Sequence, residues 1–178
     1  MSPSGPEDVI LREIRRTLLA RRLLLHGVRT QFITGLTDLT EDRQKTLRKR
    51  LGIDAKSRLR GNPRDAVTLF LGTSLARAEA AAIAALLWIF EIPIERNAPA
   101  IPERVSFAFG DRLCDTYETY CTCYPRTKVT LDEIIELRKK LARGDRLRLG
   151  RCKDCKCLLL IDRNDASLEC FHCGGVPG

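Results

Sequence analysis

The chain is poor in the residues from which most active sites are built. Only two of its 178 residues are histidine, His26 and His172, and neither lies in a catalytic pattern. It also lacks a glycine-rich loop that could cradle phosphates and a nucleophile with an identifiable base beside it. The sequence therefore predicts a protein that is not an enzyme.

Long apolar runs are missing as well. The longest uncharged apolar stretch, Ala80 to Phe90, has 11 residues, well short of the ~20 that span a bilayer. Residues 1–8 are polar, acidic and interrupted by proline, unlike the basic and then apolar start of a secretory signal. We expect a cytoplasmic protein with no membrane partner, whose eight cysteines serve metal binding or core packing rather than disulfides.

Cationic side chains are abundant. The chain has 31 Lys and Arg against 23 Asp and Glu, which gives a formal net charge of +8. An excess of this size suits a polyanionic partner, nucleic acid first and an anionic membrane surface second.

Apolar spacing and capping residues predict a mostly α-helical protein. Thr40 is a candidate N-cap, with Glu41 and Asp42 in the first turn, and Thr130 and Glu133 have the spacing of a capping box. The predicted helices cover residues 7–26, 30–36, 40–51, 62–90, 106–123 and 130–144.

Two of these helices carry more detailed predictions. The first is expected to have one apolar face, made by Ile10, Leu11, Ile14, Leu18, Leu24 and Leu25. The fourth is expected to start at Asn62-Pro63 and to continue to Phe90, with a kink near Gly72. Because its second half is apolar all round, we expect that half to be a buried central helix.

The C-terminal part contains the strongest motif of the sequence. Two Cys-x-x-Cys pairs, Cys152 with Cys155 and Cys170 with Cys173, are separated by 14 residues, a spacing close to that of structural zinc sites. Four thiolates close a tetrahedron and leave no open position for catalysis. We therefore predict one structural Zn²⁺ ion, although Cys157 could replace Cys155 as a ligand. Buried or redox-active thiols, or iron in a rubredoxin-like site, are the alternatives.

This motif also defines a predicted module. Leu158 to Ile161 is expected to pair with Ser167 to Glu169 as a hairpin around the turn at Asp162–Asp165. The fold class is then a helical domain, residues 1–146, followed by a small zinc-ribbon-like β-hairpin module, residues 147–178. His172, which lies inside the second cysteine pair, is not expected to be a metal ligand.

Three further cysteines lie upstream of this module. Cys114, Cys121 and Cys123 fall on one predicted helix, with Cys114 and Cys121 on the same face as Tyr117. Because a fourth ligand is missing there, core packing is the better interpretation.

Two basic clusters, residues 43–64 and 138–156, are the candidate surfaces for nucleic acid. Lysine and arginine clusters bind phosphates by releasing counterions. Each could instead be a solvated helix face, but two clusters, one of them next to the cysteine motif, favour nucleic acid. Residues 30–51 also have the outline of a helix-turn-helix, without its turn glycine. The proposed DNA contacts are Arg43, Lys45, Arg48, Lys49, Arg50, Lys56, Arg58, Arg60, Arg148, Arg151 and Lys153.

In their order along the chain, these features resemble the flagellar transcriptional activator FlhC family, over about residues 10 to 175. The similar segments are Leu24–Gln31, Leu39–Arg43, Leu47–Gly52, Leu86–Phe90 and Tyr117–Pro125, followed by the four cysteines. The linker around residues 56–62 differs from the proline-rich linker usual in the family, and the family's tail after the last cysteine pair is missing.

The resemblance implies a subunit that assembles with an FlhD-like partner, binds double-stranded DNA upstream of promoters and recruits RNA polymerase. Carried over by position, Cys152, Cys155, Cys170 and Cys173 would hold the zinc. The regulon would be flagellar or, as in relatives on conjugative elements, a set of transfer genes. The alternative from another class is a zinc-bearing protein-interaction module of a transcription complex, without direct DNA contact.

Overall fold

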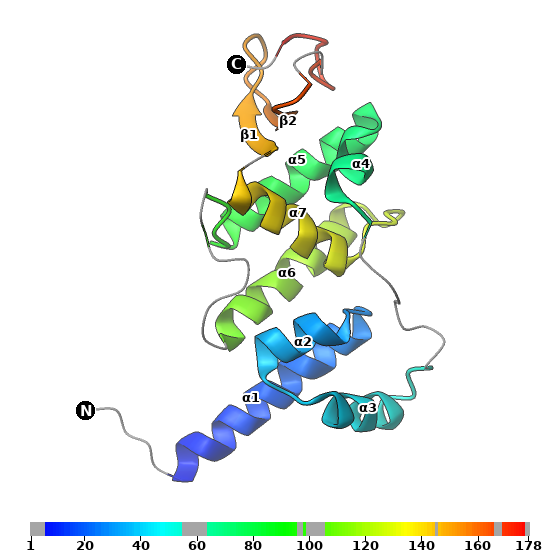
Figure 1. Cartoon of the computed structure of the whole chain (residues 1–178), viewed down its shortest axis with the longest axis vertical. Coiled ribbons are helices and arrows are strands. Elements are labelled where there is room, and N and C mark those ends of the chain that lie inside the picture. Colours follow the sequence, from blue (N-terminus) through cyan, green and yellow to red (C-terminus); the bar gives the residue numbers. More distant parts are fainter. Residues whose placement is uncertain are drawn as a thin grey trace, which may run out of the picture. The chain divides into compact units, whose positions relative to one another are not determined.

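The computed structural model describes residues 6–54, 64–95, 98, 106–144, 146–165 and 169–176, and for residues 6–8 only the backbone. In this part of the chain the protein is mostly helical, with a small antiparallel hairpin near the C-terminus (Figure 1). The elements are α1 (Pro6–Leu25), α2 (Thr30–Thr37), α3 (Glu41–Arg50), α4 (Ala66–Leu71), α5 (Ser74–Ile89), α6 (Phe107–Cys123), α7 (Leu131–Arg143), β1 (Leu147–Arg151) and β2 (Leu158–Asp162).

The contacts divide the chain into two compact units. Unit 1 comprises Met1–Gly61 and Ile101–Cys114, and unit 2 comprises Asn62–Ala100 and Asp115–Gly178. The hairpin lies in unit 2, where β2 packs on α5 and β1 contacts α7. The predicted boundary at residue 146 does not coincide with a division between these units, and the zinc-binding module of residues 147–178 stays a prediction.

Unit 1 is built on α1, α2 and α3, which all contact one another. The buried side of α1 consists of Leu19, Ala20, Leu23 and Leu24, each at most 2% exposed. The apolar face predicted for this helix is therefore not its buried side. Of the six apolar residues assigned to it only Leu24 is buried, because a second set of apolar residues fills the core instead.

The α2 and α3 helices are joined by residues 38–40. Asp38 adopts a left-handed conformation (φ 58°), and the Thr40 hydroxyl accepts a hydrogen bond from the Arg43 N–H as the predicted N-cap. Inside this corner the fully buried Gln44 donates through Nε2 to the Thr34 hydroxyl (2.9 Å) and to the Leu39 carbonyl (3.0 Å). These bonds fix α3 to α2 and to the turn.

The fourth predicted helix differs from the prediction. Asn62 and Pro63 lie outside the described residues, and the helix begins at Ala66, because Asp65 caps the Thr68 N–H. The helix ends at Gly72. A second helix, α5, then begins, with the Thr73 hydroxyl as its N-cap. The second half of the predicted helix, which lies in α5, is also not buried on all sides.

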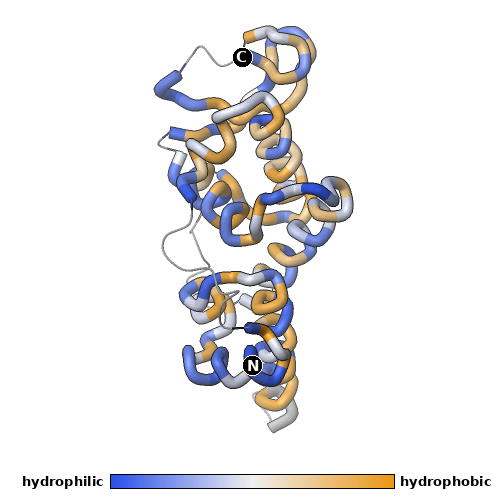
Figure 2. The backbone as a smooth tube through the Cα atoms, turned by 90° about the vertical axis from the view of Figure 1, so that its right-hand side faces the viewer, coloured by the Kyte–Doolittle hydropathy of each residue, from blue (hydrophilic) through white to orange (hydrophobic). Residues whose placement is uncertain are grey.

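One side of α5 is buried and the other reaches solvent at its C-terminal end. Ala80, Ile83 and Leu87 are fully buried, whereas Trp88 is 72% and Ile89 is 61% exposed. Hydrophobic and hydrophilic residues alternate along the helices (Figure 2), as expected for helices that bury one face.

The last two helices confirm their predictions. The Ser106 hydroxyl accepts the Phe109 N–H at the start of α6. In α7 both bonds of the Thr130–Glu133 capping box form, and Gly144 ends the helix with φ 62°.

The hairpin is present, and β2 confirms the predicted strand Leu158–Ile161, whereas residues 167 and 168 of the predicted partner strand lie outside the described residues. Leu158–Asp162 pairs with Leu147–Arg151, the segment before the first cysteine pair, with Leu149 opposite Leu160. Arg146 closes the open end of the hairpin by donating three hydrogen bonds to the Asp162 carboxylate. This contact holds the pKa of Asp162 below its usual value. In the described part of the chain, no helix is both long and apolar enough to cross a membrane.

Candidate metal centre

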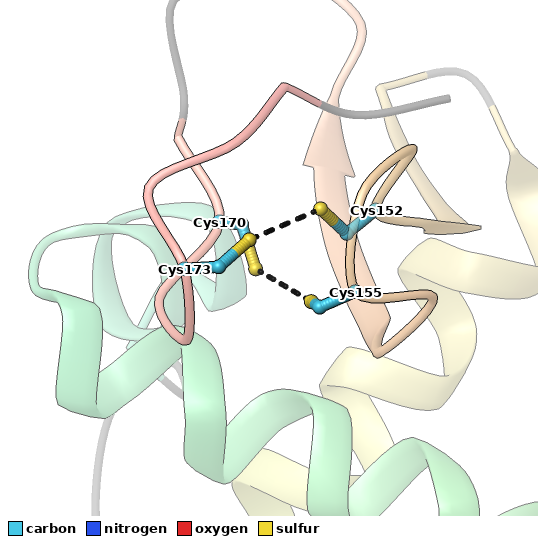
Figure 3. A group of neighbouring side chains, drawn as sticks. All are labelled: Cys152, Cys155, Cys170 and Cys173. Atoms are coloured by element: carbon cyan, nitrogen blue, oxygen red, sulfur yellow. Dashed lines mark hydrogen bonds between the residues drawn. The ribbon is translucent and has the colours of Figure 1, made fainter.

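The four cysteines of the two Cys-x-x-Cys pairs meet at one point beside the hairpin. Cys152 and Cys155 lie in the turn between β1 and β2, and Cys170 and Cys173 lie in the segment after β2. Their side chains point toward one another from these two loops (Figure 3). All four sulfur atoms lie within 4.8 Å of one another, so this cluster could hold a metal ion.

The two loops have the same backbone geometry. In the first, the Lys156 N–H donates to the Cys152 carbonyl (3.2 Å) and the Cys152 N–H donates to the Cys157 carbonyl (3.0 Å). In the second, the Gly174 N–H donates to the Cys170 carbonyl (2.9 Å) and the Cys170 N–H donates to the Gly175 carbonyl (2.7 Å). We call these the first knuckle, Cys152–Cys157, and the second knuckle, Cys170–Gly175.

Each knuckle also has a left-handed residue at its fifth position. Lys156 has φ 63° and Gly174 has φ 75°. This turn lets the chain double back so that both thiols of a pair project to the same side. The repeated Cys-x-x-Cys spacing thus produces two local copies of one ligand loop.

The sulfur separations fit tetrahedral coordination. The Sγ atoms of Cys152 and Cys173 are 3.5 Å apart, and those of Cys155 and Cys170 are 3.7 Å apart. A tetrahedron with metal–sulfur bonds of ~2.3 Å has edges of about 3.8 Å. Cys152 and Cys170 are nearly fully buried, whereas Cys155 is half-buried and Cys173 is exposed. The residues present therefore fit a metal bound at the edge of the unit.

The hydrogen bonds of the cluster favour one thiolate. Burial raises the pKa of the Cys170 thiol, but the N–H groups of Cys173 and His172 and the neighbouring thiols lower that pKa to about 6. For Cys173 the Gly175 N–H lowers the pKa, and the contacts with Cys152 and Cys155 raise it to about 12. Neighbouring thiolates repel one another, and a divalent cation removes that repulsion.

Cys157 lies next to this cluster. Its sulfur is 3.3 Å from that of Cys155 and 3.2 Å from that of Cys170, shorter than a tetrahedral edge. Cys157 is not one of the four mutually close sulfur atoms. His172 is exposed and contributes its backbone N–H, which agrees with the expected bystander role of its ring.

The two knuckles approach closely at Gly175. A Cβ atom built at this position would lie 2.0 Å from Asp154 Oδ2 and 3.2 Å from Cys152 Sγ. A Lys153 N–H to Val176 carbonyl hydrogen bond (3.2 Å) joins the same two segments. No sequence pattern signals this contact, because it depends on how the two loops face each other.

The upstream cysteines do not form a second cluster among the described residues. Cys114 is buried, as core packing predicts, whereas Cys121 is half-buried and Cys123 is exposed.

The predicted DNA contacts of α3 have different surroundings. Arg43 donates to Glu13 (3.0 Å), Lys45 pairs with Asp42 (3.0 Å), and half-buried Arg48 donates to the Thr30 hydroxyl (3.5 Å). The remaining two, Lys49 and Arg50, are both exposed in the last turn of α3. Lys56, Arg58 and Arg60 lie outside the described residues.

The predicted contacts of the second cluster lie on or beside the hairpin. Arg148 and Lys153 are exposed and line a hollow of about 580 Å³ together with Arg163, which is not among the predicted DNA contacts. Asp162 and Asp165 line it too, so the hollow carries both signs of charge. Arg151 is exposed and donates to the Lys156 carbonyl (3.1 Å).

The fold and the site thus define a helical protein with a four-cysteine cluster on a small hairpin. No protein-family model matches the chain, and a search of curated proteins finds no significant match.

Proposed function

We propose that the protein is a DNA-binding subunit of a transcriptional activator, which acts with an FlhD-like partner to switch on flagellar or conjugative-transfer operons. The observation that carries this proposal is the α2–turn–α3 corner. Helix-turn-helix motifs join two helices through three or four residues and place the second helix in the major groove. Here three residues join α2 to α3, and Asp38 supplies the left-handed turn conformation that a glycine often provides.

Charge supports one part of α3 as the contact surface. Glu41 and Asp42 lie in its first turn and would repel phosphates, whereas Lys49 and Arg50 extend into solvent from its last turn. We therefore expect the last turn to approach the DNA backbone. Arg148, Arg151 and Lys153 are a separate candidate surface in unit 2.

In this proposal the four cysteines bind one Zn²⁺ ion, which is structural. Sets of four cysteine ligands are typical of structural zinc, and four protein ligands leave no position for a substrate or a reactive water. The ion would join the two knuckles and contribute directly to folding. We accordingly propose that the protein has no catalytic activity.

A second candidate function is a protein-interaction module without direct DNA contact. It is favoured by the exposed Trp88 and Ile89, which line an apolar hollow of about 440 Å³ with Leu149 and Leu158. In that case the zinc would stabilise the strands that form one wall of the hollow.

The DNA-binding proposal is tested by replacing Lys49 and Arg50 together with alanine. Two lost phosphate contacts should weaken DNA binding and reduce the slope of log K against log salt concentration by about 2. Arg48 is left in place because its contact with Thr30 belongs to the fold. Binding is measured with promoter fragments that the assembled complex selects from genomic DNA.

The matched control is the double variant Arg126→Ala/Lys128→Ala. These two exposed cations lie between α6 and α7, so the control removes the same charge from another surface. Unchanged binding and salt slope in the Lys49/Arg50 variant would remove α3 from the interface. If no DNA fragment is selected even with the partner present, the interaction module becomes the better account.

A further inference from the structure

The α1 helix has a second apolar face, which the described residues leave uncovered. Leu11, Ile14, Leu18 and Leu25 are between 49% and 57% exposed. At 3.6 residues per turn they form a stripe about 60° wide on the side opposite the buried Leu19, Ala20, Leu23 and Leu24. Isolated exposed leucines are ordinary, but four on one line indicate an interaction surface.

The spacing of this stripe is that of a coiled coil. Leu11, Leu18 and Leu25 are seven residues apart, and Ile14 takes the intermediate position between the first two. Leucine and isoleucine at these a and d positions pack as knobs into the holes of a facing helix. The stripe therefore fits another helix better than a loop or a strand.

Cationic side chains lie beside and within the stripe. Arg15 and Arg22 follow one edge, and Arg21 takes the position that Ile14 holds one heptad earlier. Arg22 is engaged by Asp111 (3.2 Å). Arg15 and Arg21 are exposed, and no ion pair is described for either within the residues that the structure covers. In coiled coils the charges beside the apolar seam select the partner.

We propose that α1 docks an amphipathic helix of a different protein, whose apolar seam is bordered by glutamate or aspartate. The leucine and isoleucine stripe provides the packing. Arg15 beside the stripe and Arg21, whose long side chain can reach from the seam to its edge, select the acidic borders. A second copy of this chain fits less well. A parallel pair would place Arg21 opposite Arg21, and an antiparallel pair that opposes Ile14 and Leu18 would place Arg21 against Leu11.

This surface goes beyond the proposed DNA contact and rests on α1 alone. A subunit that needs a partner would have a use for it, but the interaction can be measured without DNA. A failure of the helix interaction would therefore leave the α3 experiment unaffected, and the reverse also holds.

The test uses the full chain and two synthetic three-heptad peptides. Both have leucine at a and isoleucine at d, except for an alanine at the d position that would face Arg21; one has glutamate and the other lysine at e and g. We expect the glutamate peptide to bind at least about tenfold more tightly, as measured by fluorescence anisotropy. Leu11→Ser/Leu18→Ser should abolish this binding, whereas Leu75→Ser, at a leucine 67% exposed on α5, should not.

A charge reversal makes the test specific. In Arg15→Glu/Arg21→Glu the preference should invert, so that the lysine peptide binds more tightly. Circular dichroism checks that each variant keeps its helices. Equal affinity for both peptides, no binding of either, or no effect of the leucine changes would overturn the proposal. So would a dimer of the chain in solution that Leu11→Ser/Leu18→Ser dissociates, because the stripe would then belong to a second copy.

Discussion

The two knuckles of the metal centre have the same hydrogen bonds but different support. The first lies between β1 and β2, whose pairing holds both of its ends, and Arg146 and Asp162 close the far end of that hairpin. The second follows β2, and its Cys170–Gly175 segment contains no strand residues. We infer that regular structure holds the first knuckle, whereas the metal and the contacts of Gly175 and Val176 hold the second.

Removing a ligand from the second knuckle should have the largest effect. We expect Cys170→Ser to lose the bound metal and to unfold the second knuckle, because a structural ion contributes its binding free energy to folding. Metal content per chain, measured by mass spectrometry, should fall from about one ion to near zero. A weaker near-UV circular dichroism signal and faster proteolysis of the segment after β2 would accompany the loss of the metal.

Cys157→Ser is the matched control for this prediction. It removes a thiol 3.2 Å from Cys170 but outside the group of four mutually close sulfurs, so metal content should stay unchanged. Loss of the metal in Cys157→Ser, with retention in Cys155→Ser, would show that Cys157 is the ligand.

The contact between the knuckles can be weakened without touching a ligand. In Gly175→Ala the new methyl group would meet Asp154 and the Cys152 sulfur. We expect a loss of roughly 2 kcal/mol in unfolding free energy, in the range of overpacked sites. Chemical denaturation of the metal-loaded protein measures it.

The double variant Asp154→Ala/Gly175→Ala separates the two contacts. The Asp154 side chain is exposed and can be removed, whereas Cys152 is held in place by the cluster. Most of the stability should return if the carboxylate is the main obstacle. A double variant as unstable as Gly175→Ala would locate the obstacle at Cys152.

The smallest effects on stability should come from substitutions at the two left-handed residues, Lys156 and Gly174, and should have opposite signs in the two knuckles. Gly174→Ala should lower the unfolding free energy by about 1 kcal/mol, because an alanine is strained at positive φ. The new Cβ atom would lie in open space, which excludes a steric clash as the cause. Lys156→Gly should relieve the same strain but stabilise by less, because glycine loses more conformational entropy on folding. Equal melting temperatures for both variants would show that backbone strain does not distinguish the knuckles.

Local signals in the sequence predicted helix ends well. Thr40 and Thr130 begin helices because their hydroxyls satisfy N–H groups a few residues away. Such a bond depends on sequence neighbours only. The cysteine spacing predicted the cluster of four cysteines for the same reason, since each Cys-x-x-Cys pair forms within one turn.

Predictions about partners in space were less successful. The apolar pattern of α1 contains two faces, and periodicity alone cannot say which one α2 and α3 cover. Similarly, Leu158–Asp162 could pair with the segment before or after it. It pairs with Leu147–Arg151, which is joined to it by the first knuckle.

The sequence by itself determined the helical class, most helix ends and the four cysteines, because capping, turns and ligand spacing act over a few residues. Tertiary structure alone decided which face of α1 is buried, which strand β2 pairs with and how closely Gly175 approaches the first knuckle. These choices depend on competition between surfaces far apart in the chain. Burial of apolar area settles that competition without regard to sequence distance.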